Sequence, residues 1–244
     1  MGSFCCKGIE MPRIVVVGSY NTDFVINLPE LPKPGETIRG SDFVTGPGGK
    51  GSNQAVAAAR LGAQVSFVVC IGRDTFGDMA EALWRAEGID TRYAQRHESA
   101  ATGAALIFVD AAGENMIAVA SGANWEMRPE HLDAAEEAFR GADALLMPLE
   151  VPLEAVDYAL TLAKKHGLRT VLNPAPARPL SAELLAKVDV LTPNQIEAEM
   201  MSGQQGDPAV QARALMGGAG QALVMTLGRR GAFWQQGDQS GTVP

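Results

Sequence analysis

Short apolar runs rich in Val, Ile and Leu alternate with helical patterns through most of this chain. The runs are RIVVVG (13–18), QVSFVVCIG (64–72), DALLMPLE (143–150), RTVLNP (169–174), VDVLTPN (188–194) and QALVMTLG (221–228). The helical patterns between them are QAVAAARLG, FGDMAEALWRAEG, PEHLDAAEEAFRG, LEAVDYALTLAKKHG and IEAEMMSG, most of them closed by glycine. This order predicts an α/β sandwich of three layers, in which helices cover both faces of a mainly parallel sheet. Ligands of such sheets bind at the carboxyl ends of the strands.

Two regions interrupt the alternation. FVINL and TIRGSDFV within residues 24–44, and TGAALIFVDAAGENMIAVA at 102–120, are strand patterns with no helix between them. The second region turns at AAGEN, as a hairpin does. We expect a small β-sheet that acts as a lid on a single domain spanning residues 13–244.

Composition excludes several classes of function. With 46% hydrophobic and 20% charged residues, the chain can bury a full core, and its formal net charge of -8 argues against nucleic acid as a partner. The three cysteines form no CxxC pair, which favours a reducing compartment such as the cytoplasm. No apolar run is long enough to cross a membrane. Residues 1–12 contain Cys5 and Cys6 and are interpreted as an extension upstream of an alternative start at Met11.

The segment GPGGKGSN (46–53) is the strongest local candidate for a ligand site. It satisfies G-x-G-x-x-G, but it does not follow directly from a predicted strand of the main sheet, as a dinucleotide fingerprint would. A Walker A loop fails because Gly51, not Ser or Thr, follows Lys50. Free backbone N–H groups, Lys50 and Asn53 suit a ligand rich in oxygen. The alternative is a glycine turn in which Asn53 only caps the following helix.

Polar residues also follow three of the predicted strands. Asn21 and Asp23 alternate onto one face, where an amide and a carboxylate can hold two hydroxyl groups. Glu150 ends another strand, and Asn194 and Glu197 stand three apart on one helical face. Each has an ordinary alternative: Asp23 in a turn, Glu150 near a helix start, and Asn194 with Glu197 as a helix cap. Their shared position at one edge of the sheet favours a site.

A series of motifs carries a resemblance to a known family. They are VVVGSYNTDFVINLPELPKPGET, GPGGKGSNQAVAAARLGA, IGRDTFGD, TGAALIFV with GENMI, LLMPLEVPLEAV, LNPAPAR, LTPNQIEAE and TLGRRGAFW. In this order, from about residue 13 to the carboxyl terminus, the sequence resembles the ribokinase, or PfkB, family of sugar kinases. Members transfer the γ-phosphoryl group of ATP to a primary sugar hydroxyl, and the resemblance favours ribose as the sugar. It also implies a requirement for Mg²⁺ and activation by a monovalent cation, usually K⁺.

The resemblance assigns roles to individual residues. The sugar lies between the main sheet and the lid in this family, held by residues that match Asn21, Asp23, Gly49, Lys50, Asn53 and Glu150. The nucleotide side is matched by Asn194, Thr226, Leu227, Gly228, Arg229, Arg230 and Gly231, with Glu197 near phosphate and magnesium. On this interpretation GPGGKGSN binds the sugar and not a phosphate.

The chain departs from the family pattern at its end. Family members continue into a GAGD motif whose Asp is the catalytic base, whereas this sequence stops at Pro244. We therefore expect the base and the K⁺ ligands beyond Pro244, and no appreciable turnover by the printed chain alone. Three hypotheses stay open: a sugar kinase whose record is cut short, a short protein that binds ribose without catalysis, and a nucleotide-dependent oxidoreductase.

Sugar identity and assembly are less constrained by the sequence. Relatives on the same scaffold phosphorylate fructose, ketodeoxygluconate or nucleosides, and we expect side chains of the 102–120 hairpin to decide among them. The family also implies a homodimer formed through the lids.

Overall fold

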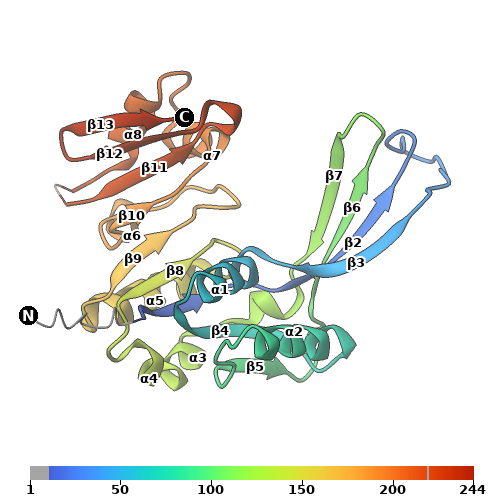
Figure 1. Cartoon of the computed structure of the whole chain (residues 1–244), viewed down its shortest axis with the longest axis horizontal. Coiled ribbons are helices and arrows are strands. Elements are labelled where there is room, and N and C mark those ends of the chain that lie inside the picture. The colour runs from blue at the N-terminus through green and yellow to red at the C-terminus, as the bar shows by residue number, and fades with distance from the viewer. Residues whose placement is uncertain (1–10, 219) are drawn as a thin grey trace, which may run out of the picture.

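The fold is described by a computed structural model for residues 11–218 and 220–244 (Figure 1). Of the predicted extension at 1–12, residues 1–10, with Cys5 and Cys6, lie outside the described residues. The remainder forms a large sheet flanked by helices and a smaller sheet that projects from it.

The large sheet follows the apolar runs of the sequence. Its strand order is β13-β12-β11-β10-β9-β8-β1-β4-β5, and all pairs are parallel except β11–β12 and β12–β13. The bounds are β1 (Arg13–Val17), β4 (Gln64–Gly72), β5 (Ala94–His97), β8 (Ala144–Met147), β9 (Arg169–Leu172), β10 (Val190–Leu191), β11 (Ala222–Thr226), β12 (Ala232–Gln236) and β13 (Gln239–Val243). The prediction of a mainly parallel α/β sheet is confirmed.

Helices cover the large sheet on two sides. They are α1 (Lys50–Arg60), α2 (Thr75–Ala86), α3 (Pro129–Ala134), α4 (Glu136–Phe139), α5 (Leu153–Lys165), α6 (Ala182–Leu185), α7 (Gln195–Ser202) and α8 (Pro208–Leu215), with short 3-10 turns η1 (Gly122–Glu126) and η2 (Gly228–Arg230). The pattern at 129–141, predicted as one helix, is two short helices separated at Ala135. Within the described residues, no helix is both long and apolar enough to span a membrane.

Alternating side chains divide the core into two clusters. Val15 and Val17 of β1 pack with α3, α4 and α5, whereas Val16 packs with α1 and α2 on the other face. Successive side chains of a strand point to opposite faces of the sheet. A sheet covered by helices on both faces therefore needs strands that are apolar at every position. The cluster under α1 and α2 contains no residue of β9–β13, so it covers only the β8-β1-β4-β5 part of the sheet.

A small sheet forms where the sequence predicted a lid, and it is called the lid below. Its order is β3-β2-β6-β7, with β2 (Asn21–Asn27), β3 (Phe43–Gly48), β6 (Gly103–Val109) and β7 (Asn115–Ala120), and it extends away from the body in Figure 1. The 102–120 hairpin agrees with the sequence. The first lid segment, expected over 24–44, has different strand bounds: β2 begins at Asn21 and β3 ends at Gly48. The shift arises because Asn21 pairs with Gly48, which brings the start of the glycine segment into the sheet.

Candidate functional site

Asn21 and Asp23 lie at the base of the lid. Both belong to β2, which follows β1 after Ser19 and Tyr20, and their places as first and third residues put them on one face of the strand. Asn21 pairs with Gly48 and Asp23 with Gly46 on β3. The sequence placed the two residues at the carboxyl edge of a main-sheet strand. The structure places them instead on a lid strand that continues from that edge.

The Asp23 carboxylate packs closely over the backbone of the glycine segment. A Cβ atom on Gly48 would overlap the Asp23 carboxyl group, so a larger residue there would require the Asp23 side chain to move. Burial raises the pKa of Asp23, and the nearby Glu150 carboxylate raises it further, while Lys50 opposes the shift. Among the described residues, no hydrogen bond to the Asp23 side chain is found. This carboxylate is therefore left to accept hydrogen bonds from a ligand.

The glycine segment turns sharply from β3 into α1. Gly49 caps α1 with φ 84°, a conformation that favours glycine. Gly51 lies against β1, because a Cβ atom there would be only 2.7 Å from the Gly18 carbonyl carbon. The backbone N–H of Gly51 donates to Ser19 Oγ at 3.3 Å, and that of Ser52 donates to the Ser19 carbonyl at 2.8 Å. The first free N–H groups of this helix are thus bound by the protein itself, contrary to the expectation that they face a ligand.

Glu150 holds this turn in place. It follows β8, and its Oε2 accepts hydrogen bonds from the backbone N–H of Lys50 at 2.8 Å and from Ser19 Oγ at 2.5 Å. Its Oε1 forms an ion pair with Lys50 Nζ at 3.1 Å. Glu150, predicted as a sugar ligand, therefore has both oxygens engaged by the Ser19–Lys50 turn. Glu150 therefore positions Lys50, and a contact between Glu150 and the sugar would be a second role.

Asn53 lies one turn into α1. Its side chain is exposed, and the cap of the helix is Gly49, with no side-chain cap bond. The alternative in which Asn53 caps the helix is therefore wrong. Asn53 borders a shallow groove with Pro47 of the lid and Val56 of α1.

The predicted nucleotide side is assembled from two neighbouring strand ends. Asn194 and Glu197 form a reciprocal cap of α7: Asn194 Oδ1 accepts from the Glu197 N–H at 2.8 Å, and Glu197 Oε2 accepts from the Asn194 N–H at 2.8 Å. Asn194 also forms a β-bridge with Thr226 at the end of β11. The structure thus shows Asn194 and Glu197 as a helix cap, which was the alternative interpretation of this pair. The cap is exposed at the edge of the sheet.

The turn after β11 carries the remaining residues of this group. Thr226, Gly228, Arg229 and Arg230 are exposed, and the Leu227 N–H closes the turn by donating to the Gly231 carbonyl at 2.8 Å. Arg230 Nη2 donates to Gln195 Oε1 at 2.5 Å, which joins the turn to α7. The structure therefore brings the two predicted nucleotide segments together.

Three positioning groups at the base of the lid were missed by the sequence analysis. Ser19 bridges Glu150 and the glycine turn, and Asn124 of η1 bonds Tyr20 and Asn21. Asp74, the cap of α2, accepts hydrogen bonds from the Thr102 N–H at 2.7 Å and Thr102 Oγ1 at 2.6 Å, just before β6. The motifs SYNTD and IGRD contain Ser19 and Asp74, but no local pattern pairs either with its distant partner.

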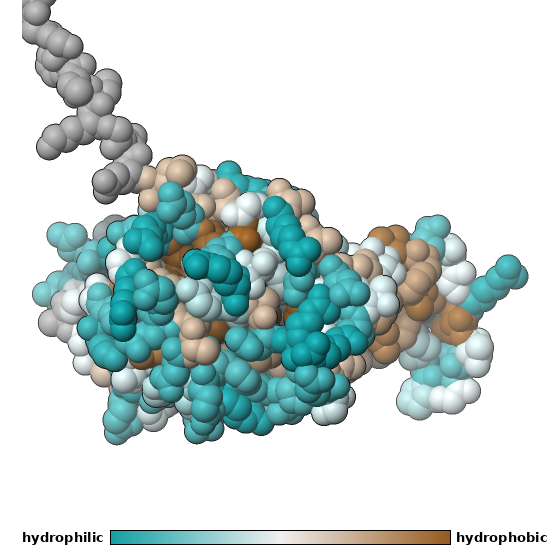
Figure 2. Space-filling view, turned by 90° about the horizontal axis from the view of Figure 1, so that it is seen from below, coloured by the Kyte–Doolittle hydropathy of each residue, from teal (hydrophilic) through white to brown (hydrophobic). Residues whose placement is uncertain are grey.

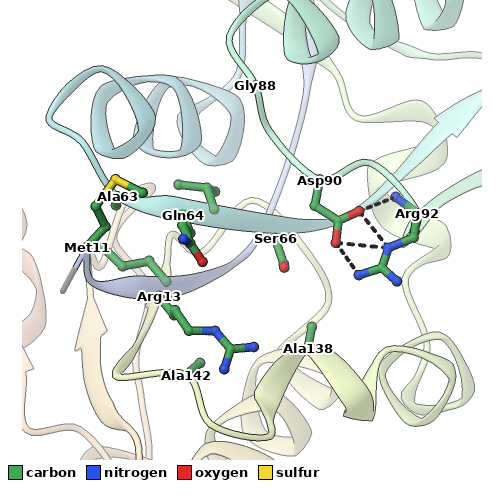
Figure 3. A pocket seen from close by; sticks show the side chains of 12 residues that line it. Met11, Arg13, Ala63, Gln64, Ser66, Gly88, Asp90, Arg92, Ala138 and Ala142 are labelled. Atoms are coloured by element: carbon green, nitrogen blue, oxygen red, sulfur yellow. Dashed lines mark hydrogen bonds and ion pairs between the residues drawn. The ribbon is translucent and has the colours of Figure 1, made fainter.

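A hollow of about 400 Å³ lies at the opposite end of the sheet (Figure 3). Arg13 and Gln64, the first residues of β1 and β4, line it together with the Asp90–Arg92 ion pair. It contains none of the residues predicted to bind sugar or nucleotide. The predicted sugar residues gather instead at the base of the lid, around the contacts between Glu150 and the glycine turn.

No resident metal centre is built from side chains alone in residues 11–218 and 220–244. There, no group of three or more His, Cys, Asp or Glu residues is arranged to hold an ion. Cys70 is a buried free thiol whose pKa is raised to about 12, chiefly by burial.

The sequence that forms these elements also matches a known protein family. Residues 11–244 match the model described as the pfkB family carbohydrate kinase. The chain belongs to the PfkB family of carbohydrate kinases. As a PfkB-family chain it is a phosphotransferase that acts on sugars, and the oxidoreductase hypothesis is wrong.

Several relatives of this PfkB-family chain are known by name. It is 44% identical over 224 residues to the ribokinase of Haemophilus influenzae, a match that covers 90% of this chain and 73% of that protein. It is 37% identical over 236 residues to the deoxyribokinase of Salmonella typhi, with 95% and 77% covered. The structure of Arabidopsis thaliana ribokinase complexed with ribose and ATP superposes with a TM-score of 0.84 at 30% identity, covering 96% of this chain and 78% of that one.

Proposed function

We propose that this protein phosphorylates ribose with ATP. The observation that carries the proposal is the Asp23 carboxylate, which has no hydrogen-bonding partner among the described residues and lies two residues after Asn21 on the lid strand β2. A charged acceptor and an amide two residues apart suit adjacent hydroxyl groups of a sugar. The similarity to named ribokinases, one of them complexed with ribose and ATP, supports ribose as the sugar.

Each predicted sugar residue has a distinct part in this proposal. Asp23 accepts hydrogen bonds from sugar hydroxyls, and Lys50 offers its ammonium group beside the same face, held there by Glu150. Gly49 allows close approach of the backbone, and Asn53 completes the edge of the site when the lid moves toward the body. Phosphoryl transfer forms a bond between the sugar oxygen and the γ-phosphorus and breaks the bond from the γ-phosphorus to the β,γ-bridging oxygen, so that ADP leaves and the hydroxyl proton passes to a general base. The reaction requires positioning and neutralisation of charge more than covalent help from the protein.

The nucleotide segments suit ATP with Mg²⁺. Kinases hold Mg²⁺ with one or two carboxylates together with substrate phosphates and water, so the single carboxylate of Glu197 fits such a role. In the proposal Asn194 and the 226–231 turn contact the nucleotide, and Arg229, exposed and without an ion pair among the described residues, offers a positive charge. A monovalent cation such as K⁺ remains part of the proposal, with no ligand assigned in this chain.

Two further proposals concern assembly and location. The lid carries apolar side chains that are about half exposed on both of its faces, Leu106 and Met116 on one and Ile117 and Val119 on the other. Figure 2 shows hydrophobic residues gathered on the projecting part of the molecule. Burying one of these faces against a second lid would form the proposed homodimer. The cytoplasm is the proposed compartment, on the argument from cysteine usage.

Deoxyribose is the second candidate sugar, because a deoxyribokinase is among the relatives. The test measures ADP formation with Mg²⁺ and K⁺ by the product of the complete reading frame that contains this sequence. Ribose, 2-deoxyribose, fructose and ketodeoxygluconate are compared by kcat/KM, with Asp23→Ala as the control against contaminating kinases. We expect the highest kcat/KM with ribose. A higher value for another sugar would replace ribose, and a product that binds ribose without turnover would support the non-catalytic hypothesis.

A further inference from the structure

Asn124 lies buried beneath the base of the lid, next to the predicted sugar residues. It belongs to η1, is 1% exposed, and makes three hydrogen bonds to residues about a hundred positions earlier in the chain. Asn124 Oδ1 accepts from the Tyr20 backbone N–H at 2.9 Å. Asn124 Nδ2 donates to the Tyr20 carbonyl at 2.8 Å and to Asn21 Oδ1 at 2.9 Å. All of its amide atoms are therefore used by the protein.

These bonds fix the orientation of two amides in turn. A backbone N–H can only donate and a backbone carbonyl can only accept, so Tyr20 determines which atom of Asn124 is oxygen and which is nitrogen. Because Asn124 Nδ2 then faces Asn21, the atom of Asn21 that meets it must be the oxygen. The Asn21 amide is thereby left with its Nδ2 group, for which the described residues offer no partner.

The close approach of the two amides depends on a glycine beside them. Gly103 is paired with Asn21 in the lid sheet. A Cβ atom on Gly103 would overlap both Asn21 Oδ1 and Asn124 Nδ2 and would be 2.7 Å from the Tyr20 carbonyl oxygen. The glycine therefore allows the two amides to meet directly above the strand.

We infer that Asn124 is a positioning residue that makes Asn21 a hydrogen-bond donor toward the sugar. The inference rests on the proposed function, since it assumes that Asn21 contacts a sugar hydroxyl. It assigns opposite roles to two residues on one strand face: Asn21 donates through Nδ2, and Asp23 accepts through its carboxylate. A hydroxyl group can both donate and accept a hydrogen bond. This pair therefore selects two sugar hydroxyls, one that accepts from Asn21 Nδ2 and one that donates to the Asp23 carboxylate.

The test is the substitution Asn124→Asp. The new carboxylate keeps an acceptor for the Tyr20 N–H, but its second oxygen can no longer donate to the Tyr20 carbonyl or to Asn21. When the Asn21 amide rotates to donate its Nδ2 group to that oxygen, it presents its own oxygen to the sugar. We expect the affinity for ribose, measured by calorimetry, to fall about 10- to 100-fold. The loss should involve one hydroxyl group of the sugar. Among ribose analogues that each lack one hydroxyl group, the analogue without that hydroxyl has no contact to lose, so its affinities for the wild-type and variant proteins should agree within about twofold.

Two further variants complete the design. Gln64→Glu makes the same amide-to-carboxylate change at the opposite end of the large sheet and should leave ribose affinity within about twofold of the wild type. Asn21→Asp keeps the acceptor for Asn124 and removes the donor, so it should reproduce the loss of ribose affinity and again spare the same analogue, even where Asn124→Asp fails to fold. An equal loss on every sugar, or unchanged ribose binding by either Asn124→Asp or Asn21→Asp, would overturn the inference alone. A wild-type protein that binds none of the sugars would overturn the proposed function and this inference with it.

Discussion

The backbone N–H of Lys50, the first residue of α1, donates a hydrogen bond to Glu150 Oε2 at 2.8 Å. The two residues are 100 positions apart, and the same carboxylate oxygen accepts from Ser19 Oγ. Glu150 thus joins the end of β1, the start of α1 and the end of β8 at one point. The position of the Lys50 ammonium group depends on this junction.

Replacing Glu150 with Ala should destabilise the protein. The Lys50 N–H and Ser19 Oγ would lose a charged acceptor, which we expect to lower the free energy of unfolding by about 1–3 kcal/mol. Urea denaturation measures the change, and Glu154→Ala, an exposed acid in the first turn of α5, is the matched control. Equal effects of the two substitutions would show that Glu150 is an ordinary surface acid.

The glycines of GPGGKG should tolerate substitution very differently. Gly51→Ala forces a Cβ atom against the backbone of Gly18, so we expect a loss of about 1–3 kcal/mol or more in the free energy of unfolding. At Gly46 a Cβ atom meets nothing within 4 Å, and Gly46→Ala should change stability by no more than about 0.5 kcal/mol. Thermal denaturation of both variants decides the matter. A stable Gly51→Ala protein would contradict the close packing of α1 on β1.

Asp23 should stabilise the folded protein less at neutral pH than in acid. Its pKa in the folded protein is raised above 3.8, so the folded state holds this proton more tightly than the unfolded chain does. The contribution of the Asp23 carboxyl group to the free energy of unfolding therefore falls as the pH rises from 3.8 to the raised pKa of Asp23 in the folded protein. Asp23→Asn should be more stable than the wild type at neutral pH but bind ribose more weakly, and the stability difference should shrink in acid. Melting temperatures measured from acid to neutral pH test it, and a variant less stable than the wild type at neutral pH would refute it.

Exchanging Asn194 for Ser separates its two possible roles. Ser caps a helix about as well as Asn, so α7 should keep its stability within about 0.5 kcal/mol. If the Asn194 amide also contacts nucleotide, the affinity for ATP with Mg²⁺ should fall about 5- to 10-fold. Asp207→Ser at the cap of α8 is a matched exchange that should leave nucleotide affinity unchanged. Unaltered ATP binding by Asn194→Ser would leave this residue as a helix cap only.

Most of the large sheet could be predicted because its signals are local. Runs such as RIVVVG and QVSFVVCIG are apolar on both faces, and the structure buries alternate residues of β1 in two different clusters. The antiparallel β12–β13 hairpin was not predicted, although Gly237 and Asp238 form a two-residue turn with φ 54° at Gly237, a recognisable hairpin signal. Short α6 and α8 were also missed, since they carry little apolar periodicity.

The site was less predictable because its bonds join distant residues. The motifs indicated Asn21, Asp23 and the glycine turn, but the shared use of Glu150 by Ser19 and Lys50 depends on how three strands are placed. The pairing of Asn21 with Gly48, which moves the glycine segment into the lid, is likewise a tertiary contact. The catalytic base and K⁺ ligands expected beyond Pro244 concern residues outside this sequence and stay a prediction.

Calorimetric titration of ribose into the wild-type chain and into Asp23→Ala is the most direct test of the account. The central claim is that the unpaired Asp23 carboxylate binds a sugar hydroxyl. We predict that the wild-type chain binds ribose and that Asp23→Ala loses about 1.5–3 kcal/mol of binding free energy, which is a decrease in affinity of about 10- to 150-fold. Unchanged ribose affinity in Asp23→Ala, with the variant folded, would contradict the claim.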